Sequence, residues 1–525
     1  MGSSTFFPSG FLAIAVFATG ADAATLSGTV TGPDGAPFRA AFVQARNAQM
    51  KMTVNVLSDA RGHYRADNLP AGDYRLQVRA VGYKADPREG VKLAAGESAA
   101  YDFALQKGVV RWSDISVQQG LELLPDARGK RELFTYCTGC HGFESRMAAV
   151  KRDEDGWRSR VAYMREVVSY AFTPQRGFDD QKAEDIVYYL NHVFGEDSTA
   201  LPRSPTDVPH YPNTVRPISE EALKIVYVIY DMPGPARMSW SALPDRDGKV
   251  WIAEYGPANK IAHLDPKTGE IAEYPVPNPR SASIHSVVPA PDGTVWLTEQ
   301  GAGRLGKWDP QTQKITEYPD TWGKHTIRVT PDGMVWSTGG LTRYDPKTET
   351  FTHIPEVPNV YGIAVDPDNN IWFAENIKDG KIGKVDAKTL QVTKYYTPTT
   401  QRPRRIQVDS DGTVWFAGLD LGMIARFDPA KETFKEFKLP GPRATPYALG
   451  IDTEHKIWYS SEAQDVLGRL DPDTGKVTEY PMPFAENGMR DFFLDAQGHV
   501  WFGSPPNNKV GYFYLADQPR ASPLP

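Results

Sequence analysis

The sequence predicts a multidomain, mainly β protein with three folded parts: a small β-sandwich, an all-α domain and a seven-bladed β-propeller. Three observations lead to this prediction. Short segments that alternate apolar and polar residues run from 24 to 107, helix-period apolar stripes occupy 112–196, and a tryptophan recurs at intervals of 36 to 45 residues within 218–515. A chain of 525 residues is also too long for one hydrophobic core, so several domains are expected.

Composition limits the possible partners. The chain is 40% apolar and carries a formal net charge of -7, without a run of lysine or arginine. Nucleic acids and anionic membranes are attracted to basic patches, so we expect neither as a partner. We also expect no membrane span, because the apolar stretch near the N-terminus is shorter than the about 20 residues that cross a bilayer.

Residues 1–23 are predicted to be a signal peptide. An apolar stretch at 11–18 is followed by small residues ending at Ala23, which is typical of a secretory signal and its cleavage site. Residues 1–10 depart from that pattern because they carry no lysine or arginine. We expect the mature chain to be exported to the periplasm.

The segment 24–107 is predicted to be a β-sandwich. Strand-like alternation at 26–30 and 74–78 is separated by turn clusters such as Gly-Pro-Asp-Gly at 32–35. The order of these strands and turns resembles the carboxypeptidase regulatory-like domain. The resemblance implies an accessory module without catalysis of its own.

The motif Cys137-Thr-Gly-Cys140-His141 contains the only two cysteines of the chain. Two thiols at this spacing can bond to one porphyrin, and the adjacent imidazole can bind its iron. The alternatives are a redox disulfide, which needs no following histidine, and a zinc site, which needs two more ligands nearby. We expect one covalent haem c on Cys137 and Cys140, with His141 as the proximal iron ligand.

The all-α domain surrounds this motif. Helical stripes at 129–134 and 183–190 resemble the N- and C-terminal helices of a class I cytochrome c domain, which cross beside the haem. The resemblance implies a cytochrome c domain over 112–196. The proline-rich stretch 197–217 is predicted to be a linker.

Three side chains are candidates for the sixth iron ligand: Met147, Met164 and His192. A thioether would raise the reduction potential and suit electron transfer. The segment 155–164 resembles the haem domain of quinohaemoprotein amine dehydrogenases, and we favour Met164. Met147 follows His141 too closely to pass easily around the ring.

The propeller is predicted from a repeat that contains one tryptophan per blade. These tryptophans are Trp251, Trp296, Trp336, Trp372, Trp415, Trp458 and Trp501. The segment 224–233 resembles the outer strand of a blade but precedes the first tryptophan. We expect it to pair with the last blade and close the ring of blades.

Two further sets of residues stand at fixed offsets from the tryptophans. Eleven positions before them lie Trp240, His285, His325, Tyr361, Arg404, Tyr447 and Arg490, and three positions after them lie carboxylates at Glu254, Glu299 and Glu375. Equivalent positions in successive blades form a ring, so these side chains should meet at one mouth of the central channel and bind a small organic substrate. The alternative is that a polar channel mouth is merely solvated.

The repeat resembles virginiamycin B (streptogramin B) lyase over residues 218–515. The resemblance implies that His285 is a general acid/base, that Glu299 helps hold Mg²⁺, and that His325 corresponds to a second, substrate-binding histidine. The family places a metal-binding glutamate two residues before the first histidine, where this chain has Ser283. The lyase chemistry therefore lacks one expected ligand.

The haem motif separates two classes of function. An elimination reaction needs no electron acceptor, whereas cytochrome domains fused to propellers resemble periplasmic dehydrogenases. We expect an oxidoreductase in which His285 acts as base with Glu299 and His325, the arginines hold an anionic group, and electrons pass through haem c to a soluble cytochrome or another periplasmic acceptor. The alternatives are a lyase that opens an ester with Mg²⁺, and a non-catalytic electron shuttle or sensor.

Overall fold

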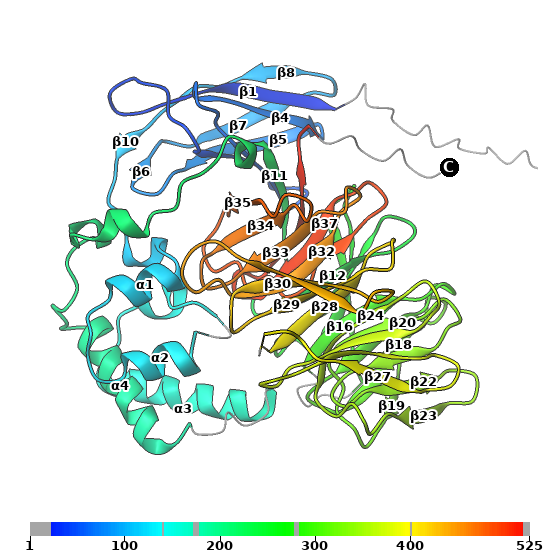
Figure 1. The fold of residues 1–525 in the computed structure, drawn as a ribbon. Coiled ribbons are helices and arrows are strands. Elements are labelled where there is room, and N and C mark those ends of the chain that lie inside the picture. The colour runs from blue at the N-terminus through cyan, green and yellow to red at the C-terminus, as the bar shows by residue number, and fades with distance from the viewer. Residues whose placement is uncertain (1–22, 139–140, 172–177, 278–282, 400–401, 518–525) are drawn as a thin grey trace, which may run out of the picture.

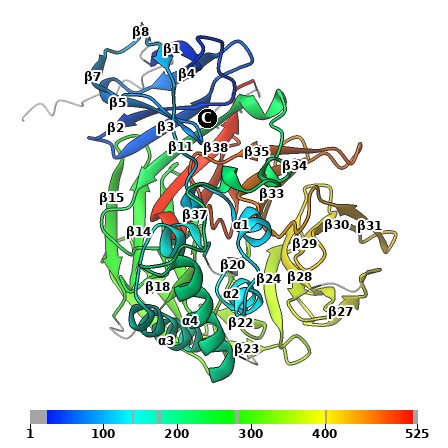
Figure 2. The same cartoon turned by 90° about the vertical axis from the view of Figure 1, so that its left-hand side faces the viewer.

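The computed structural model describes residues 23–138, 141–171, 178–277, 283–399 and 402–517, and it is mainly β. Figure 1 shows a β-sandwich above a propeller, with the helices beside the propeller and below the sandwich. Figure 2, turned by 90°, shows the helices lying in front of the propeller. The predicted signal peptide, except for Ala23, lies outside the described residues.

The N-terminal sandwich is confirmed. One sheet has the order β4-β1-β8, with β9 also pairing with β1, and the other contains β3-β2-β5-β7. Apolar side chains from both sheets pack into one core, which includes Leu26, Val43 and Leu76. The strands are β1 Ala24–Thr31, β2 Phe42–Asn47, β3 Met52–Leu57, β4 His63–Leu69, β5 Gly72–Arg79, β6 Tyr83–Lys84, β7 Arg88–Leu93, β8 Ser98–Ala100, β9 Phe103–Ala104 and β10 Gln106–Lys107.

The propeller consists of seven four-stranded blades within the described residues. Each tryptophan of the repeat lies on the second strand of its blade and is 1% or 2% exposed. The first three blades comprise β12 Ser239–Pro244, β13 Val250–Glu254, β14 Lys260–Asp265, β15 Glu270–Pro275; β16 Ile284–Pro289, β17 Val295–Glu299, β18 Arg304–Trp308, β19 Ile315–Pro319; β20 Ile327–Val329, β21 Val335–Ser337, β22 Thr342–Asp345 and β23 Thr350–His353. The next three comprise β24 Val360–Val365, β25 Ile371–Glu375, β26 Ile382–Val385, β27 Val392–Tyr395; β28 Pro403–Val408, β29 Val414–Gly418, β30 Met423–Asp428, β31 Thr433–Lys438; β32 Pro446–Ile451, β33 Ile457–Ser461, β34 Val466–Leu470 and β35 Val477–Pro481.

The seventh blade is closed by a strand from the start of the propeller, as the sequence predicted. It contains β36 Phe493–Leu494, β37 Val500–Ser504, β38 Lys509–Leu515 and β11 Ile225–Asp231. The other edge of β11 pairs with β3 of the sandwich, so one eight-stranded sheet joins the two domains. Both faces of β11 are buried: Val228 packs into the sandwich core, and Tyr227 packs towards blades six and seven.

The helices form a separate unit with its own core. Their predicted apolar stripe is confirmed, because Ile186, Val187, Tyr189 and Leu190 are all buried. The elements are η1 Trp112–Asp114, α1 Val117–Leu123, α2 Lys130–Tyr136, the π-turn η2 Glu144–Ala148, α3 Glu154–Ala171, α4 Asp180–Phe194, η3 Pro205–Asp207, η4 Tyr211–Thr214 and η5 Glu221–Lys224. Leu201 and Tyr211, in the stretch predicted to be a linker, pack against this core.

The predicted all-α cytochrome c domain is wrong as a fold assignment. The helical unit has four α-helices in its described residues, and α1 and α2 are only seven residues long. No group of three or more His, Cys, Asp or Glu side chains that could hold a metal ion was found in the described part of the chain. Apolar stripes at helical spacing predict which residues are buried, but they do not determine how short helices cross or which family the resulting core belongs to.

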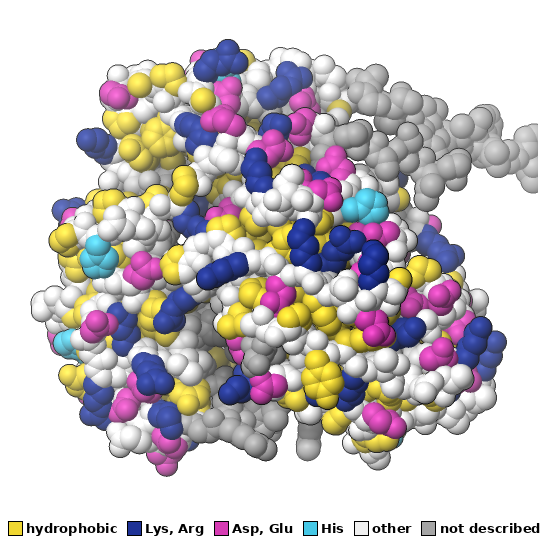
Figure 3. All heavy atoms as spheres, in the orientation of Figure 1, with side chains coloured by type: hydrophobic (Ala, Val, Ile, Leu, Met, Phe, Trp, Pro, Cys, Tyr) yellow, Lys and Arg dark blue, Asp and Glu magenta, His cyan; other side chains and the backbone are white. Residues whose placement is uncertain are grey.

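The surface carries mixed charge. Lysine and arginine side chains are interspersed with aspartate and glutamate side chains over the face drawn in Figure 3. Among the described residues, no helix is long and apolar enough to cross a membrane.

Candidate functional site

A β-bulge lies at the ring position of five blades. The register of the first strand against the second is irregular across Trp240, His285 and Tyr361, and also across the Arg404 and Tyr447 positions. A bulged residue leaves the ladder and its side chain is turned to a new direction. The bulge therefore explains how one residue per blade can leave the blade packing and point towards its neighbours in the ring.

The seven ring side chains contact one another in blade order. The Trp240 and His285 rings have centroids 5.6 Å apart, His285 and His325 are 3.6 Å apart, and His325 and Tyr361 are 4.5 Å apart. The hydroxyls of Tyr361 and Tyr447 share a hydrogen bond. The structure thus brings the first half of the ring together through tilted contacts between aromatic and imidazole groups.

Two arginines complete the ring. The Arg404 guanidinium lies 3.9 Å from the Tyr447 ring centroid and donates to the Tyr447 hydroxyl at 3.0 Å. The Arg490 guanidinium lies 4.6 Å from the Tyr447 ring and 5.1 Å from the Trp240 ring, which returns to the first blade. Such cation–π contacts are strongest where water is excluded.

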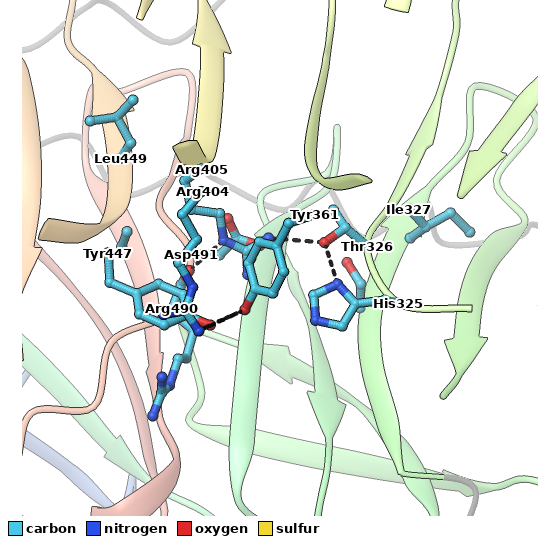
Figure 4. A network of polar contacts seen from close by, with 12 residues as sticks. His325, Thr326, Ile327, Tyr361, Arg404, Arg405, Tyr447, Leu449, Arg490 and Asp491 are labelled. Atoms are coloured by element: carbon cyan, nitrogen blue, oxygen red, sulfur yellow. Dashed lines mark hydrogen bonds and ion pairs between the residues drawn. The ribbon is translucent and has the colours of Figure 1, made fainter. Parts of the chain in front are cut away.

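Sequence reasoning missed three charged residues of this site: Arg405, Glu462 and Asp491. Arg405 donates to the Arg490 carbonyl at 2.9 Å and to the Thr326 hydroxyl at 2.9 Å, and its guanidinium lies 3.4 Å from Asp491 (Figure 4). Glu462 lies 3.1 Å from Arg490. Arg405 follows Arg404 inside the bulge, so the two adjacent arginines in the sequence were the signal that could have indicated a second charged residue at this site.

Both histidines are expected to be neutral. His285 is 1% exposed. Burial, and then the charges of His325, Arg405 and Arg490, hold the pKa of His285 well below its usual range. Burial and the arginines also hold the pKa of His325 well below its usual range. A neutral imidazole has a nitrogen lone pair that can accept a proton, which a base requires.

The three carboxylates at the second offset make their polar contacts inside their own blades. Glu375 lies 2.7 Å from Lys394, and Glu254 lies 3.7 Å from Arg237. Glu299 is completely buried, and burial followed by the carboxylate of Glu317 raises its pKa to about 8. The structure therefore does not place these groups in the ring with the aromatic side chains and arginines.

The described residues near His285 do not fit an Mg²⁺ site. The position of the expected glutamate is occupied by Ser283, which is 7% exposed. Among the described residues, no group of three or more His, Cys, Asp or Glu side chains around His285 and Glu299 could hold a metal ion. Mg²⁺ is normally held by carboxylates, water and substrate oxygens, and Ser283 does not replace the missing carboxylate.

A second feature is a cavity of about 510 Å³ between the helices and the propeller. Cys137 and His141 line it, together with aromatic side chains from the helical unit and with Met238 and Pro505 from the propeller. Cavities of about 300–1,000 Å³ are typical of small-molecule and cofactor sites. Cys140, the second predicted attachment residue, lies outside the described residues.

The side chains of this cavity fit a haem. Cys137 lines the cavity, and the Nδ1–H of His141 donates to the Gly142 carbonyl at 2.7 Å. That hydrogen bond leaves Nε2 without a proton, as an iron ligand must be. Three arginines at the cavity supply the charge that haem propionates need: Arg146, Arg152 and Arg160.

The candidate sixth ligands are not equally placed. Met147 and Met164 both line the cavity. His192 instead stacks on Tyr188, with centroids 5.9 Å apart, and lines two other surface hollows with Asn191.

The cavity meets the ring at a small second hollow of about 20 Å³. His141 from the helices and Arg490 from the ring both line it, together with Glu462 and Glu486. Ser145 fixes this junction, because its N–H and hydroxyl donate to the Glu486 carboxylate at 3.0 and 2.6 Å. His141 of the Cys137–His141 motif therefore lies beside the propeller mouth.

Comparisons with known proteins agree with two of the domains. The carboxypeptidase regulatory-like domain matches residues 25–106, and the virginiamycin B lyase family matches residues 348–525. No curated protein matches the chain. A solved structure of selenomethionine-substituted virginiamycin B lyase from Staphylococcus aureus is 25% identical, with a TM-score of 0.50, and the match covers 55% of this chain and 98% of that one. A streptogramin B lyase structure is 26% identical, with a TM-score of 0.52, and the match covers 57% of this chain and 100% of that one.

The fold and the site define a propeller protein with a polar and aromatic ring at one mouth. More particularly, the chain has a carboxypeptidase regulatory-like domain and a virginiamycin B lyase-like propeller. The comparisons and the structure give no support for a cytochrome c domain between them.

Proposed function

We propose that this chain is a periplasmic haem c oxidoreductase whose propeller mouth binds a small organic substrate. The observation that carries the proposal is the shared hollow, in which His141 of the haem motif and Arg490 of the ring line the same walls. The predicted signal peptide and the attachment motif support export, since c-type haem is generally attached outside the bacterial inner membrane.

The helical unit would hold the haem through Cys137, Cys140 and His141. When bound, haem c supplies a one-electron acceptor that can pass electrons to a soluble cytochrome or another periplasmic acceptor. Attachment requires only the two thiols and the imidazole, so it does not depend on a cytochrome c fold. The apolar lining of the cavity, which includes Trp157 and Val161, would exclude water from the porphyrin.

The propeller would bind and deprotonate the substrate. Burial and the nearby positive charges lower the pKa of His285 and keep it neutral, so its nitrogen lone pair is available to the substrate's proton. Three arginines face two carboxylates, which leaves one formal positive charge for a substrate anion: Arg404, Arg405 and Arg490 against Glu462 and Asp491. An aromatic or planar substrate would stack on Trp240 or Tyr447.

A lyase is the second candidate. Both solved lyases match the propeller over nearly their whole length, and His285 and Glu299 stand at two of the expected positions. Ser283 and the lack of a third donor in the described residues argue against the Mg²⁺-assisted reaction.

Covalent haem attachment tests the first candidate. We expect the full chain, produced in a host that attaches c-type haem, to keep its haem after denaturation, as measured by intact mass and by haem staining. The Cys137→Ala/Cys140→Ala variant should lose it. A wild-type chain without haem under these conditions would eliminate the oxidoreductase proposal.

An ester assay separates the second candidate. If the chain is a lyase, a streptogramin-type ester with Mg²⁺ will be opened, and His285→Ala will abolish the opening. His455→Ala is the matched control, because that imidazole is 55% exposed and pairs with Asp409 at the outside of the propeller. We expect no opening by either the wild type or the variants.

A further inference from the structure

The cavity next to the haem motif contains a methionine that the sequence did not single out. Met238 belongs to the propeller, in the segment that leads into β12, yet it lines the cavity together with Cys137 and His141. Met147 and Met164 line it from the helical unit, which also carries His141. Thioethers therefore reach the cavity from both sides.

The propeller wall of this cavity offers one soft ligand. Its other lining residues are Ala236, Pro257, Pro505, Pro506 and Asn508. Among these described residues, Met238 alone carries a sulfur or imidazole ligand of the kind that binds haem iron in proteins. A haem held by His141 in this cavity would therefore have one soft ligand available from the propeller wall.

The backbone around Met238 is held in a costly conformation. Ala236 and Met238 have φ angles of 56° and 49°, in the left-handed region that side chains other than glycine and asparagine rarely adopt. Such a conformation persists only where its surroundings enforce it. Ser283, two residues before His285 in the next blade, has a similar φ of 46°, so this conformation is a feature of the repeat.

Asn508 enforces this conformation. Its side-chain oxygen accepts the N–H of Arg237 at 2.8 Å and the N–H of Met238 at 3.2 Å, and its side-chain NH₂ donates to the Gly234 carbonyl at 2.6 Å. One amide of blade seven thus fixes the loop that carries Met238.

The same segment continues into the substrate ring. Trp240 follows two residues later, and the Met238 carbonyl accepts the N–H of Tyr255, whose ring stacks on Trp240 at 4.2 Å. A displacement of Trp240 by a bound substrate would therefore act on the backbone of Met238.

We propose that Met238 would bind the iron of a haem held by His141 in this cavity, so that the propeller itself would supply one ligand. This inference rests on the proposed haem function. Asn508 is then a positioning residue for Met238, and Met147 and Met164 of the helical unit only line the cavity. A thioether ligand raises the reduction potential, which suits a haem that takes electrons from a substrate at the adjacent ring.

Leucine substitutions in the haem-loaded full chain test this assignment, because leucine conserves volume and removes the sulfur. We expect Met238→Leu to lose the near-infrared charge-transfer band of thioether-ligated ferric haem, to bind carbon monoxide readily when reduced, and to show a lower midpoint potential. Met164→Leu and Met147→Leu should keep the band. Met232→Leu is the matched control, since Met232 is buried in the sandwich core six residues earlier.

The outcomes separate the inference from the proposed function. A haem-loaded Met238→Leu that keeps the band overturns the assignment and leaves the oxidoreductase intact. A wild-type chain that carries no haem overturns both. Asn508 itself has a φ of 56°, which glycine also adopts, so Asn508→Gly should fold normally. We expect its charge-transfer band to weaken on mild warming while the circular dichroism stays unchanged. A band as stable as that of the wild type would show that Asn508 does not position Met238.

Discussion

The imidazole rings of His285, in β16, and of His325, just before β20 of the next blade, lie with their centroids 3.6 Å apart. Two charged imidazoles at this separation would repel each other, and both are surrounded by arginines. The contact is therefore stable only while both rings are neutral, which makes this pair the acid-sensitive part of the propeller.

Stability should fall on acidification because of this pair. The folded pKa of each histidine is below the ordinary value of about 6.5, so the unfolded chain binds more protons in the window below that value. Their contribution is fully present above about pH 6.5 and is lost as pH falls, with a slope of up to about 1.4 kcal/mol per pH unit for each group. Urea unfolding between pH 5 and 8 would measure it.

His285→Gln should flatten that pH dependence. His455→Gln is the control, since the exposed His455 has its pKa raised by its hydrogen bond to Asp409 and contributes in the opposite sense. An unchanged slope in His285→Gln would show that the pair is not a source of acid sensitivity.

Glu299 should act in the opposite direction. Its folded pKa of about 8 is above the usual value of 4.5, so the native state binds the extra proton and stability falls as pH rises through this window. Glu299→Gln should remove the part of the pH-dependent loss of stability that comes from Glu299, and should therefore stabilise the chain near pH 8. Glu375→Gln, at the equivalent position, should destabilise it by about 1–3 kcal/mol because Lys394 loses its carboxylate partner and keeps only the Glu356 carbonyl. Equal effects of the two variants would contradict the assignment.

The tyrosine hydroxyls of the ring can be tested with a matched pair. Tyr447→Phe leaves Arg404 and Tyr361 without the hydroxyl that they contact, and should lower the free energy of unfolding by about 1–3 kcal/mol. Tyr459→Phe in the same blade should be close to neutral, because the buried Tyr459 hydroxyl has no hydrogen-bond partner in the described structure. The prediction fails if Tyr459→Phe is the more destabilising change.

The repeat allowed much of the site to be predicted from the sequence. Fixed offsets from Trp251 and its equivalents identified the ring from Trp240 to Arg490, because a tandem repeat puts equivalent positions in equivalent places. The bulges that aim these residues, and the contacts of Arg405 with Asp491, depend on packing between blades and leave no periodic pattern. Met238 was missed for the same reason, since its role depends on how the helices dock.

The sandwich should protect an aggregation-prone strand. Without residues 24–107, β11 would expose the edge that now pairs with β3 and the apolar face that the sandwich core now covers. Free strand edges associate with one another, so the truncated chain should form oligomers in size-exclusion chromatography with light scattering. Adding Val228→Lys should reduce that association. A monomeric truncated chain would show that the edge is not a liability.

The substrate-reduced minus oxidised absorption spectrum of the haem-loaded full chain tests the central claim most directly. We predict that a small organic anion, added without oxygen, will produce the bands of ferrous haem c in the wild type, and that His285→Gln will slow this reduction while a chemical reductant still acts fully. If substrates that bind at the ring never reduce the haem, although the chemical reductant does, electron transfer from the propeller mouth to His141 is contradicted.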